Sequence, residues 1–179
     1  EWGPKLRALI HYICNVEGSN NKVVVFSSFT SYLDLIGDAL ACLSISFATF
    51  TGKHNQKQRQ QSLQQFKEPE TRVLLVSLKA GGTGLNLTMA SRVVLMEPWW
   101  APAIEEQAWD RVHRMGQKAS KVEVVRFVMK KTIEERLLAI QEKKKALGVG
   151  ALSRLSAEQL RKMRLDDLDD LFSDSFAGN

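Results

Sequence analysis

The sequence predicts an α/β fold in which helices cover both faces of a mostly parallel sheet. Short apolar runs rich in β-branched residues alternate along the chain with segments of helical periodicity, which is the pattern of βαβ units. Several runs are apolar at nearly every position, as in strands buried on both faces. With 179 residues, 44% of them hydrophobic, the chain can bury a core of its own.

Five strands are expected, among them the apolar runs KVVVFSSF, RVLLVS and KVEVVRFV. The predicted strands cover residues 22–29, 44–50, 72–77, 90–97 and 121–128. In parallel sheets, function gathers in the loops that follow the carboxyl ends of strands. We therefore expect functional residues after Phe29, Phe50, Ser77 and Glu97.

Helical segments separate these strands, and their ends carry recognisable signals. Thr30 or Ser31 is expected to cap the helix after the first strand. The fourth helix begins on a proline and stops before Gly116, and Thr132 and Glu135 form a capping box for the fifth. The predicted helices cover residues 3–16, 30–41, 55–67, 102–115 and 132–147.

Charge divides the chain into a body and a tail. Residues 1–150 hold 21 Lys and Arg against 14 Asp and Glu, a balance of +7, whereas residues 151–179 hold 4 against 6. A basic body suits a polyanion such as nucleic acid, although lysines also serve simply to solvate a surface. A possible Ser156–Gln159 capping box and leucines spaced by three predict a short amphipathic helix in the tail, with a loose end from about Ser173.

Several classes of protein are disfavoured. No run of about 18 apolar residues occurs, so no membrane span is expected. Cys14 and Cys42 are too few for a disulfide framework and are expected to be buried thiols, and three isolated histidines argue against a metal site. Because the chain starts at Glu1 without a methionine or a leader, we expect it to be a piece of a longer protein.

A glycine-rich stretch, SLKAGGTGLNLT at residues 77–88, follows the third strand. Its glycines allow the backbone to approach a phosphate or a sugar, but a tight strand-to-helix turn needs the same freedom. The chain contains no GxxxxGK[ST], no GxGxxG after the first strand, and no strand that ends in paired acids. A dinucleotide-binding domain is therefore disfavoured, and the chain alone is not expected to bind and hydrolyse ATP.

Two arginines stand three residues apart in QAWDRVHRMGQ, residues 107–117. On a helix, Gln107, Asp110, Arg111 and Arg114 would share one face. One interpretation is an Asp110–Arg114 surface pair, worth about 0.3–0.5 kcal/mol. The other is a rigid pair of guanidiniums that meets a phosphate, as arginine fingers do in phosphoryl transfer. The pattern alone leaves both open.

Two further stretches offer candidate contacts. Trp99 and Trp100 follow the fourth strand, and because adjacent residues seldom both bury, at least one is expected to face a groove or a partner. The hydroxyls of FSSFTSY, residues 26–32, follow the first strand, where they can contact phosphates or cap a helix.

The order of these stretches is more specific than any one of them. VVVFSSFTSYLDLI, FTGKHNQKQRQQSLQQF, LLVSLKAGGTGLNLTMASRVVLMEPWWAP and QAWDRVHRMGQKASKVEVVRFV resemble, in sequence order, the motifs of the second RecA-like lobe of Swi/Snf-type superfamily 2 ATPases. SLKAGG, EPWW and DRVHRMGQK are most similar to the branch of helicase-like transcription factor and the post-replication repair proteins. The resemblance covers about residues 1–150 and implies a RecA-like three-layer sandwich, with residues 151–179 as a partly helical acidic tail.

The resemblance implies an ATP-driven motor that tracks along double-stranded DNA in the nucleus. ATP with Mg²⁺ would lie between two lobes, and the P-loop and magnesium-binding acids would belong to the N-terminal lobe of the same polypeptide. This chain would then be inactive alone. Nucleosomes or repair proteins are implied as further partners. The alternative is a catalytically idle RecA-like module that docks DNA or protein, which would not need an intact arginine pair.

The resemblance also implies roles for individual residues. Arg111 and Arg114 match the arginines that reach the ATP phosphates, and Gln107, Gly84 and Asn86 match positions at the nucleotide. The positions implied to contact nucleic acid are Ser27, Ser28, Thr30, Ser77, Lys79, Thr83 and Trp100. Ala101 departs from the asparagine that many relatives carry after this tryptophan.

Overall fold

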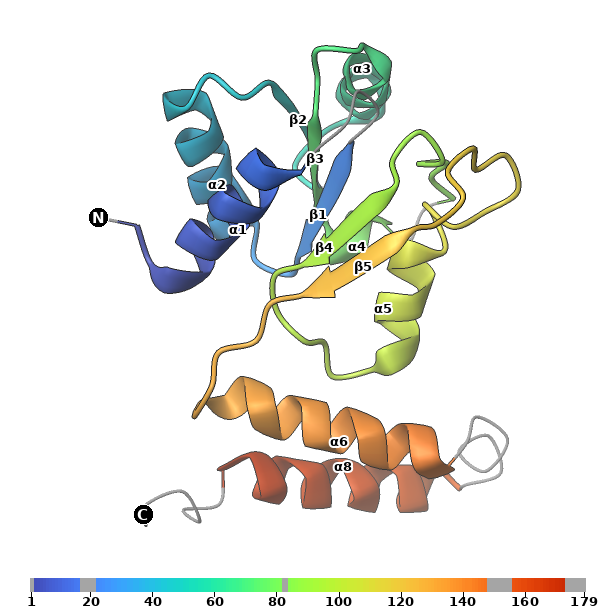
Figure 1. The fold of residues 1–179 in the computed structure, drawn as a ribbon. Helices are drawn as coiled ribbons and strands as arrows, with labels where there is room; N and C mark the ends of the chain where they lie inside the picture. Colours follow the sequence, from blue (N-terminus) through green and yellow to red (C-terminus); the bar gives the residue numbers. More distant parts are fainter. Residues whose placement is uncertain (1, 17–21, 82–83, 148–155, 173–179) are drawn as a thin grey trace. The chain divides into compact units, whose positions relative to one another are not determined.

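The sheet is five-stranded and entirely parallel, in the order β2-β3-β1-β4-β5 (Figure 1). The structure is a computed structural model that describes residues 2–16, 22–81, 84–147 and 156–172. The strands are β1 Val23–Ser27, β2 Phe47–Phe50, β3 Val73–Ser77, β4 Arg92–Leu95 and β5 Glu123–Arg126. Each lies within its predicted range, and the expected parallel α/β sheet is confirmed.

One face of the sheet is covered by α1 (Pro4–Asn15) and α2 (Thr30–Cys42). Their apolar residues pack onto alternate strand residues, because successive side chains of a strand point to opposite faces. The fully buried members of this cluster include Leu9, Ile13, Leu33, Ile36, Leu40, Val23, Val25, Leu75 and Val94.

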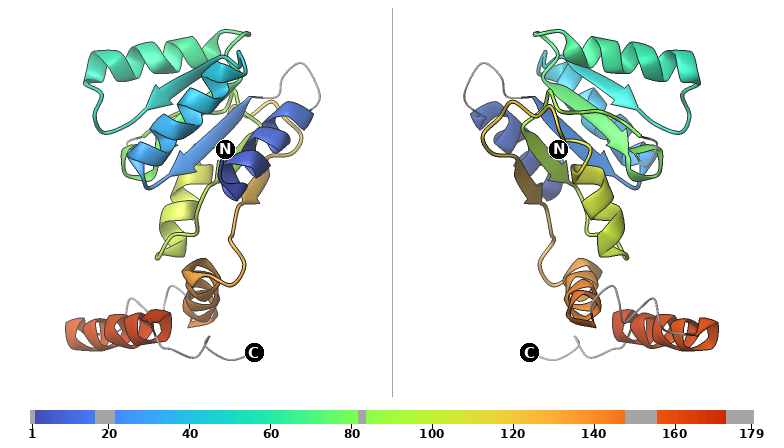
Figure 2. Two further views of the ribbon diagram at one scale, coloured as in Figure 1. Left: turned by 90° about the vertical axis from the view of Figure 1, so that its left-hand side faces the viewer. Right: turned by 90° about the vertical axis from the view of Figure 1, so that its right-hand side faces the viewer.

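The opposite face is covered by α3 (Gln56–Lys67), α4 (Leu78–Gly81) and α5 (Pro102–Trp109) (Figure 2). Strand β2 shows the two faces directly. Phe47 lies against Gly37 of α2, whereas the ring of Phe50 lies 5.5 Å from the guanidinium carbon of Arg59 in α3. Helices therefore lie on both faces, and the expected RecA-like three-layer sandwich is confirmed.

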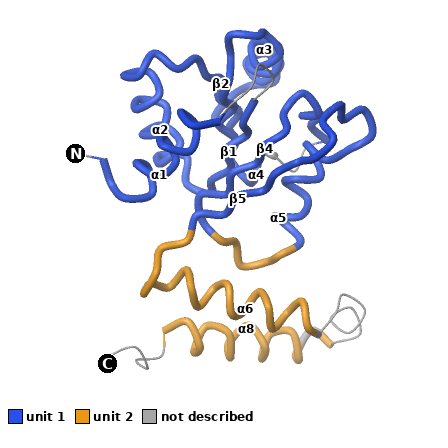
Figure 3. The backbone as a smooth tube through the Cα atoms, in the orientation of Figure 1, with its two compact units in different colours: residues 1–97, 103–127 blue, residues 98–102, 128–179 orange. Residues whose placement is uncertain are grey.

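The chain divides into two compact units (Figure 3). Unit 1 comprises Glu1–Glu97 and Ala103–Phe127 and contains the sheet; unit 2 comprises Pro98–Pro102 and Val128–Asn179. In unit 2, α6 (Ile133–Leu147) and α8 (Ala157–Phe172) pack together. The predicted domain boundary between residues 150 and 151, and the predicted loose end from Ser173, lie outside the described residues.

Several helix ends differ from the prediction. Phe29 is the N-cap of α2, so neither Thr30 nor Ser31 caps it. At α6 the Thr132 hydroxyl accepts from the Glu134 N–H at 3.2 Å, but the Glu135 carboxylate accepts from Lys131 rather than Thr132. The Ser156–Gln159 box forms both bonds, at 2.8 and 3.2 Å, and α8 has 16 residues rather than the short helix expected.

Two composition-based expectations can be compared with the described residues. Cys14 and Cys42 are free thiols, but both are exposed, so the expectation that they are buried was wrong. Each lies on the outer side of a helix whose opposite side packs on the sheet. None of the described helices has the length and apolar character needed to cross a membrane.

Candidate functional site

The predicted helix through residue 115 ends at Trp109, and residues 110–116 form turns instead. Continuing the helix would require the carbonyls of Arg111 and Val112 to accept from amides four residues later. The Arg111 carbonyl instead accepts from the Leu87 N–H at 2.9 Å, and the Val112 carbonyl accepts from the Gln117 side-chain amide at 3.0 Å. Tertiary hydrogen bonds thus replace the helical ones, and the predicted extent of this helix was wrong.

The two arginines therefore do not share a helix face. Arg111 is half-buried, whereas Arg114 is exposed. Asp110 is also exposed, and within the described residues no ion pair joins it to Arg114, so the simple helical pair is not formed. The Arg114 guanidinium makes no hydrogen bond or ion pair with any described residue. It is available to an anion.

The segment of residues 110–117, here called the arginine turn, is fixed to the turn that precedes β4. The Gln117 amide donates to the Ala90 carbonyl at 2.8 Å, in addition to its bond to Val112. Gly116 has φ +98°, a conformation that side-chain-bearing residues rarely adopt, and closes the turn beside Thr88. The arginine turn is therefore held by backbone and amide bonds rather than by its own charged side chains.

Two of the positions predicted to meet a nucleotide, Asn86 and Arg111, are brought together here. The Asn86 side-chain oxygen accepts from the Thr88 N–H at 3.1 Å and from the Thr88 hydroxyl at 2.8 Å. Its amide group is left as a donor, since the side chain is exposed. Gly84 is exposed with φ +57°, Gln107 is exposed on α5, and Thr83 lies outside the described residues.

The loop of residues 113–122 also encloses a polar hollow of about 460 Å³. His113, Arg114, Gln117 and Lys121 are among the residues that line it. Arg114 and Lys121 place two positive side chains around this hollow, which suits an anionic group.

The second group of predicted residues lies at the carboxyl ends of two inner strands. Ser27 and Ser77 are paired at the carboxyl ends of β1 and β3, and Lys79 is exposed on α4 just beyond. Residues 86–91 and 117–122, in contrast, lead into the amino ends of β4 and β5. The candidate residues therefore fall into one group at the carboxyl ends of β1 and β3 and another beside the amino ends of β4 and β5, and the expectation of function in the loops after Phe29, Phe50, Ser77 and Glu97 stays a prediction.

A carboxylate organises the turn after β1. Glu97 accepts from the Ser27 hydroxyl at 3.0 Å and from the Ser28 N–H, and the Phe29 N–H in turn donates to the Ser27 hydroxyl at 3.1 Å. Ser27 is fully buried, while Ser28 and Thr30 are half-buried. Sequence reasoning missed this role of Glu97. An acid just past one strand and serines at the end of another would have signalled it had the β1–β4 pairing been known.

Trp100 lies in unit 2, and one face of its ring is covered by a lysine of the same unit. The Lys144 ammonium sits 4.2 Å from the centre of its ring, within the range of a cation–π contact. Lys144 pairs with Asp167 of α8 at 2.9 Å, and the two side chains are 12% and 2% exposed. Trp100 also lines a cavity of about 550 Å³ whose other walls include Leu160, Met163 and Leu168. The expectation that one tryptophan faces a groove agrees with this position.

Comparison with known proteins identifies the class. The family model for the helicase conserved C-terminal domain matches residues 4–116, so the chain belongs to that family. It is a second RecA-like lobe of the Swi/Snf type of superfamily 2, as the resemblance indicated.

Particular relatives narrow the placement. The chain is 43% identical over 180 residues to DNA repair protein RAD5 of Candida albicans (strain SC5314 / ATCC MYA-2876), covering 95% of this chain and 16% of that protein. It is 49% identical over 156 residues to DNA repair protein RAD5B of Arabidopsis thaliana, covering 87% and 12%. The crystal structure of the C-terminal part of the Fun30 ATPase domain superposes with a TM-score of 0.73 at 28% identity, covering 93% of this chain and 53% of that one. The chain thus spans only a small part of its curated relatives.

Proposed function

We propose that this chain is the C-terminal ATPase lobe of a nuclear, ATP-dependent translocase on double-stranded DNA that acts in DNA repair or chromatin remodelling. The observation that carries the proposal is the exposed guanidinium of Arg114, which pairs with none of the described residues, on a turn fixed to the sheet in a member of the helicase C-terminal family. Relatives named as DNA repair proteins and a structural neighbour named as an ATPase domain support this proposal.

The donors around the arginine turn fit a nucleotide. ATP with Mg²⁺, when bound, supplies the phosphoryl group that is transferred to water. Arg111 and Arg114 carry permanent charge and planar sets of donors, which match phosphate oxygens and would offset charge that develops during transfer. Asn86 would donate to a ribose hydroxyl, and Gln107 and exposed Gly84 would complete this wall. The described residues contain no group of three or more His, Cys, Asp or Glu able to hold a metal ion, so Mg²⁺ would be held chiefly by the N-terminal lobe.

The residues at the carboxyl ends of β1 and β3 would form a contact surface for the DNA backbone. Lys79 is exposed at the carboxyl end of β3, and Ser28 and Thr30 follow β1 with half-buried side chains. Buried Ser27 would act through its bond to Glu97 by holding this turn in shape, and Ser77 would act at the end of β3. Trp100 of unit 2, with Lys144 over its ring, is proposed as a separate DNA contact.

The test is Arg114→Ala in the full-length protein with both lobes present. Removal of an arginine finger is expected to lower the DNA-stimulated turnover number by about 10³-fold or more while DNA affinity stays within about twofold. Arg7→Ala is the matched control, because Arg7 is an exposed arginine on the outer side of α1. Wild-type turnover in the Arg114 variant would contradict the assignment of this residue.

The alternative is an idle RecA-like module that docks DNA or protein without hydrolysis. The presence of both Arg111 and Arg114, together with the glycine-rich stretch of residues 77–88, favours a catalytic role, because a docking module would not need that combination. Absence of DNA-stimulated ATP turnover from the full-length wild-type protein, with DNA binding retained, would favour the docking module. The isolated lobe is expected to show no hydrolysis above blank in either case.

A further inference from the structure

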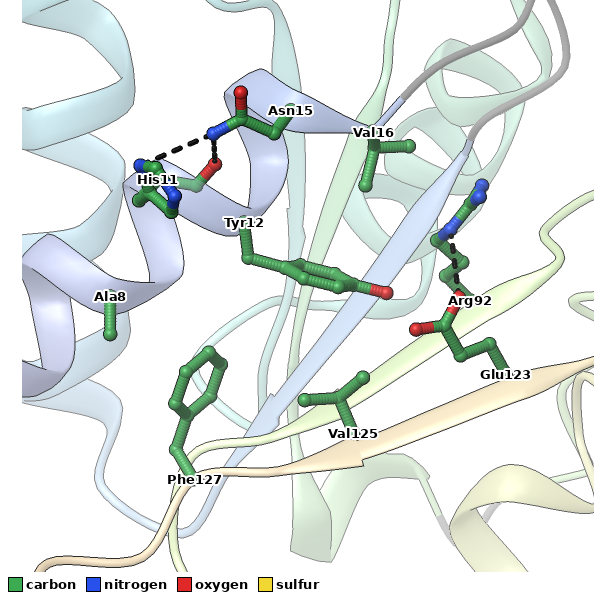
Figure 4. Close-up of a pocket in the computed structure, with 9 residues that line it drawn as sticks. All are labelled: Ala8, His11, Tyr12, Asn15, Val16, Arg92, Glu123, Val125 and Phe127. Atoms are coloured by element: carbon green, nitrogen blue, oxygen red, sulfur yellow. Dashed lines mark hydrogen bonds and ion pairs between the residues drawn. The ribbon is translucent and has the colours of Figure 1, made fainter.

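A hollow of about 670 Å³ lies between α1 and β5, and none of the residues predicted to meet a nucleotide or DNA lines it (Figure 4). Tyr12, Val125 and Phe127 form its apolar walls, and each is a half-buried side chain packed against the core. The Arg92–Glu123 ion pair, 3.3 Å long, closes one end. The volume is in the range of protein ligand sites, about 300–1,000 Å³.

The hollow adjoins the open edge of the sheet. Among the described strands β5 pairs with β4 alone, over four consecutive residue pairs. The Glu123 N–H donates to the carbonyl of Ser91, just before β4, and the Phe127 N–H donates to the carbonyl of Leu95 in β4, each at 2.9 Å. Because backbone groups alternate in direction along a strand, those of Val124 and Arg126 point to the open edge. An edge of this kind is a template for another strand.

The centre of this edge is apolar and in register. Proteins guard open edges with proline, bulges or charges. β5 has no proline, keeps an uninterrupted register with β4, and exposes 42% of Val124. Its two charged residues, Glu123 and Arg126, pair with Arg92 and Glu105. The side chains of Glu123, Val125 and Phe127 alternate with that of Val124 and line the hollow. A strand added here would therefore direct every second side chain into the hollow.

We propose that β5 and this hollow form a docking site for an extended segment of a partner protein that adds to the sheet as an antiparallel strand. Main-chain bonds to Val124 and Arg126 would supply affinity, and the hollow would supply specificity, as in other cases of strand addition. Read from its N-terminus, the segment places bulky apolar residues opposite Phe127 and Val125. A lysine or arginine follows two residues later, opposite the Glu123 carboxylate, whose side chain is 46% exposed.

A second copy of this chain fits the site less well. If two β5 strands pair antiparallel around Val125, Glu123 lies opposite Phe127 and gains no positive partner. Pairing around Val122 brings Lys121 opposite Glu123 but leaves Val125 and Phe127 uncovered. Pairing around Phe127 sets Met129 opposite Val125 and Lys131 opposite Glu123, but Lys130 and Lys131 form a turn, with φ +58° at Lys131, and do not extend the strand. The folded chain therefore does not satisfy charge and apolar contacts together by self-pairing, which favours a different chain as the occupant.

The experiment uses a short fluorescein-labelled peptide in which isoleucine, phenylalanine and lysine occupy successive alternate positions, separated by threonines. Titration of this chain is followed by anisotropy and by the amide NMR shifts of Val124 and Arg126, and saturable binding with shifts at both amides is expected. Val124→Pro removes only a donor that faces the open edge, a position where a sheet tolerates proline. It is expected to weaken binding at least about threefold, the equivalent of one hydrogen bond.

Val124→Thr is the matched control, because threonine keeps the N–H and a β-branched side chain; binding within about twofold of wild type is expected. Ala8→Trp fills the hollow from α1 and should abolish binding. This variant provides an independent test if the proline variant fails to fold. Absence of saturable binding to the wild-type chain would overturn the proposal. Equal binding of the peptide with reversed residue order, equal affinities of the Pro and Thr variants, or dimerisation through β5 would overturn it too.

Discussion

Glu105 is predicted to fix α5, which leads into the arginine turn, onto the sheet. Its carboxylate is fully buried and pairs with the Arg126 guanidinium of β5 at 2.6 Å, while the Arg126 side chain is 24% exposed. Removing one partner of a buried ion pair costs about 3–5 kcal/mol, because the other charge is left uncompensated. Because water can reach part of Arg126, the loss of stability in Glu105→Ala should lie at the lower end of this range, about 3 kcal/mol.

Urea unfolding measures this loss. With a slope of about 2 kcal/mol per molar, a loss of about 3 kcal/mol lowers the urea midpoint by about 1.5 M. Glu106→Ala is the matched control, since Glu106 is the exposed neighbour on the same helix and should change stability by less than about 0.5 kcal/mol. If the midpoints of the Glu105 and Glu106 variants coincide, the ion pair does not hold α5 and the reasoning is refuted.

Two further predictions concern other charged groups. Burial, reinforced by a neighbouring carboxylate, raises the pKa of Tyr12 from 10.0 to about 12. Its stabilising contribution is therefore complete below pH 10 and lost as pH rises through about 12, and Tyr12→Phe should show a smaller fall in urea midpoint over that range. Lys144→Met leaves the buried Asp167 carboxylate without its cation and should lower the free energy of unfolding of unit 2 by about 3 kcal/mol. Lys143→Met, at an exposed neighbour, should change the melting of α6 and α8 little.

The sheet was predictable because its signal is local. β1 and β3 are continuous apolar runs, and in the structure all their residues are buried. The α3 capping box between Asn55 and Gln58 also involves only neighbours in sequence, although it was not predicted. Elements set by such short-range patterns were found with errors of a few residues at their ends.

The arginine turn was not predictable in the same way. Its residues continue a plausible helix, and the helix ends because Leu87, 24 residues earlier in the chain, donates to the Arg111 carbonyl. Periodicity contains no information about such a bond. The acceptor role of Glu97 for the Ser27 hydroxyl was missed for the same reason, since it depends on which strand lies beside β1.

The placement of candidate residues at both ends of the strands has a consequence for coupling between them. Ser27 and Ser77 lie at the carboxyl ends of β1 and β3, whereas residues 86–91 and 117–122 lead into the amino ends of β4 and β5, and a strand of four residues spans about 13 Å. The residues of β1 and β3 between these ends are all buried. Coupling between the two groups through unit 1 would therefore pass through close-packed strands, where even a change of one methylene is felt.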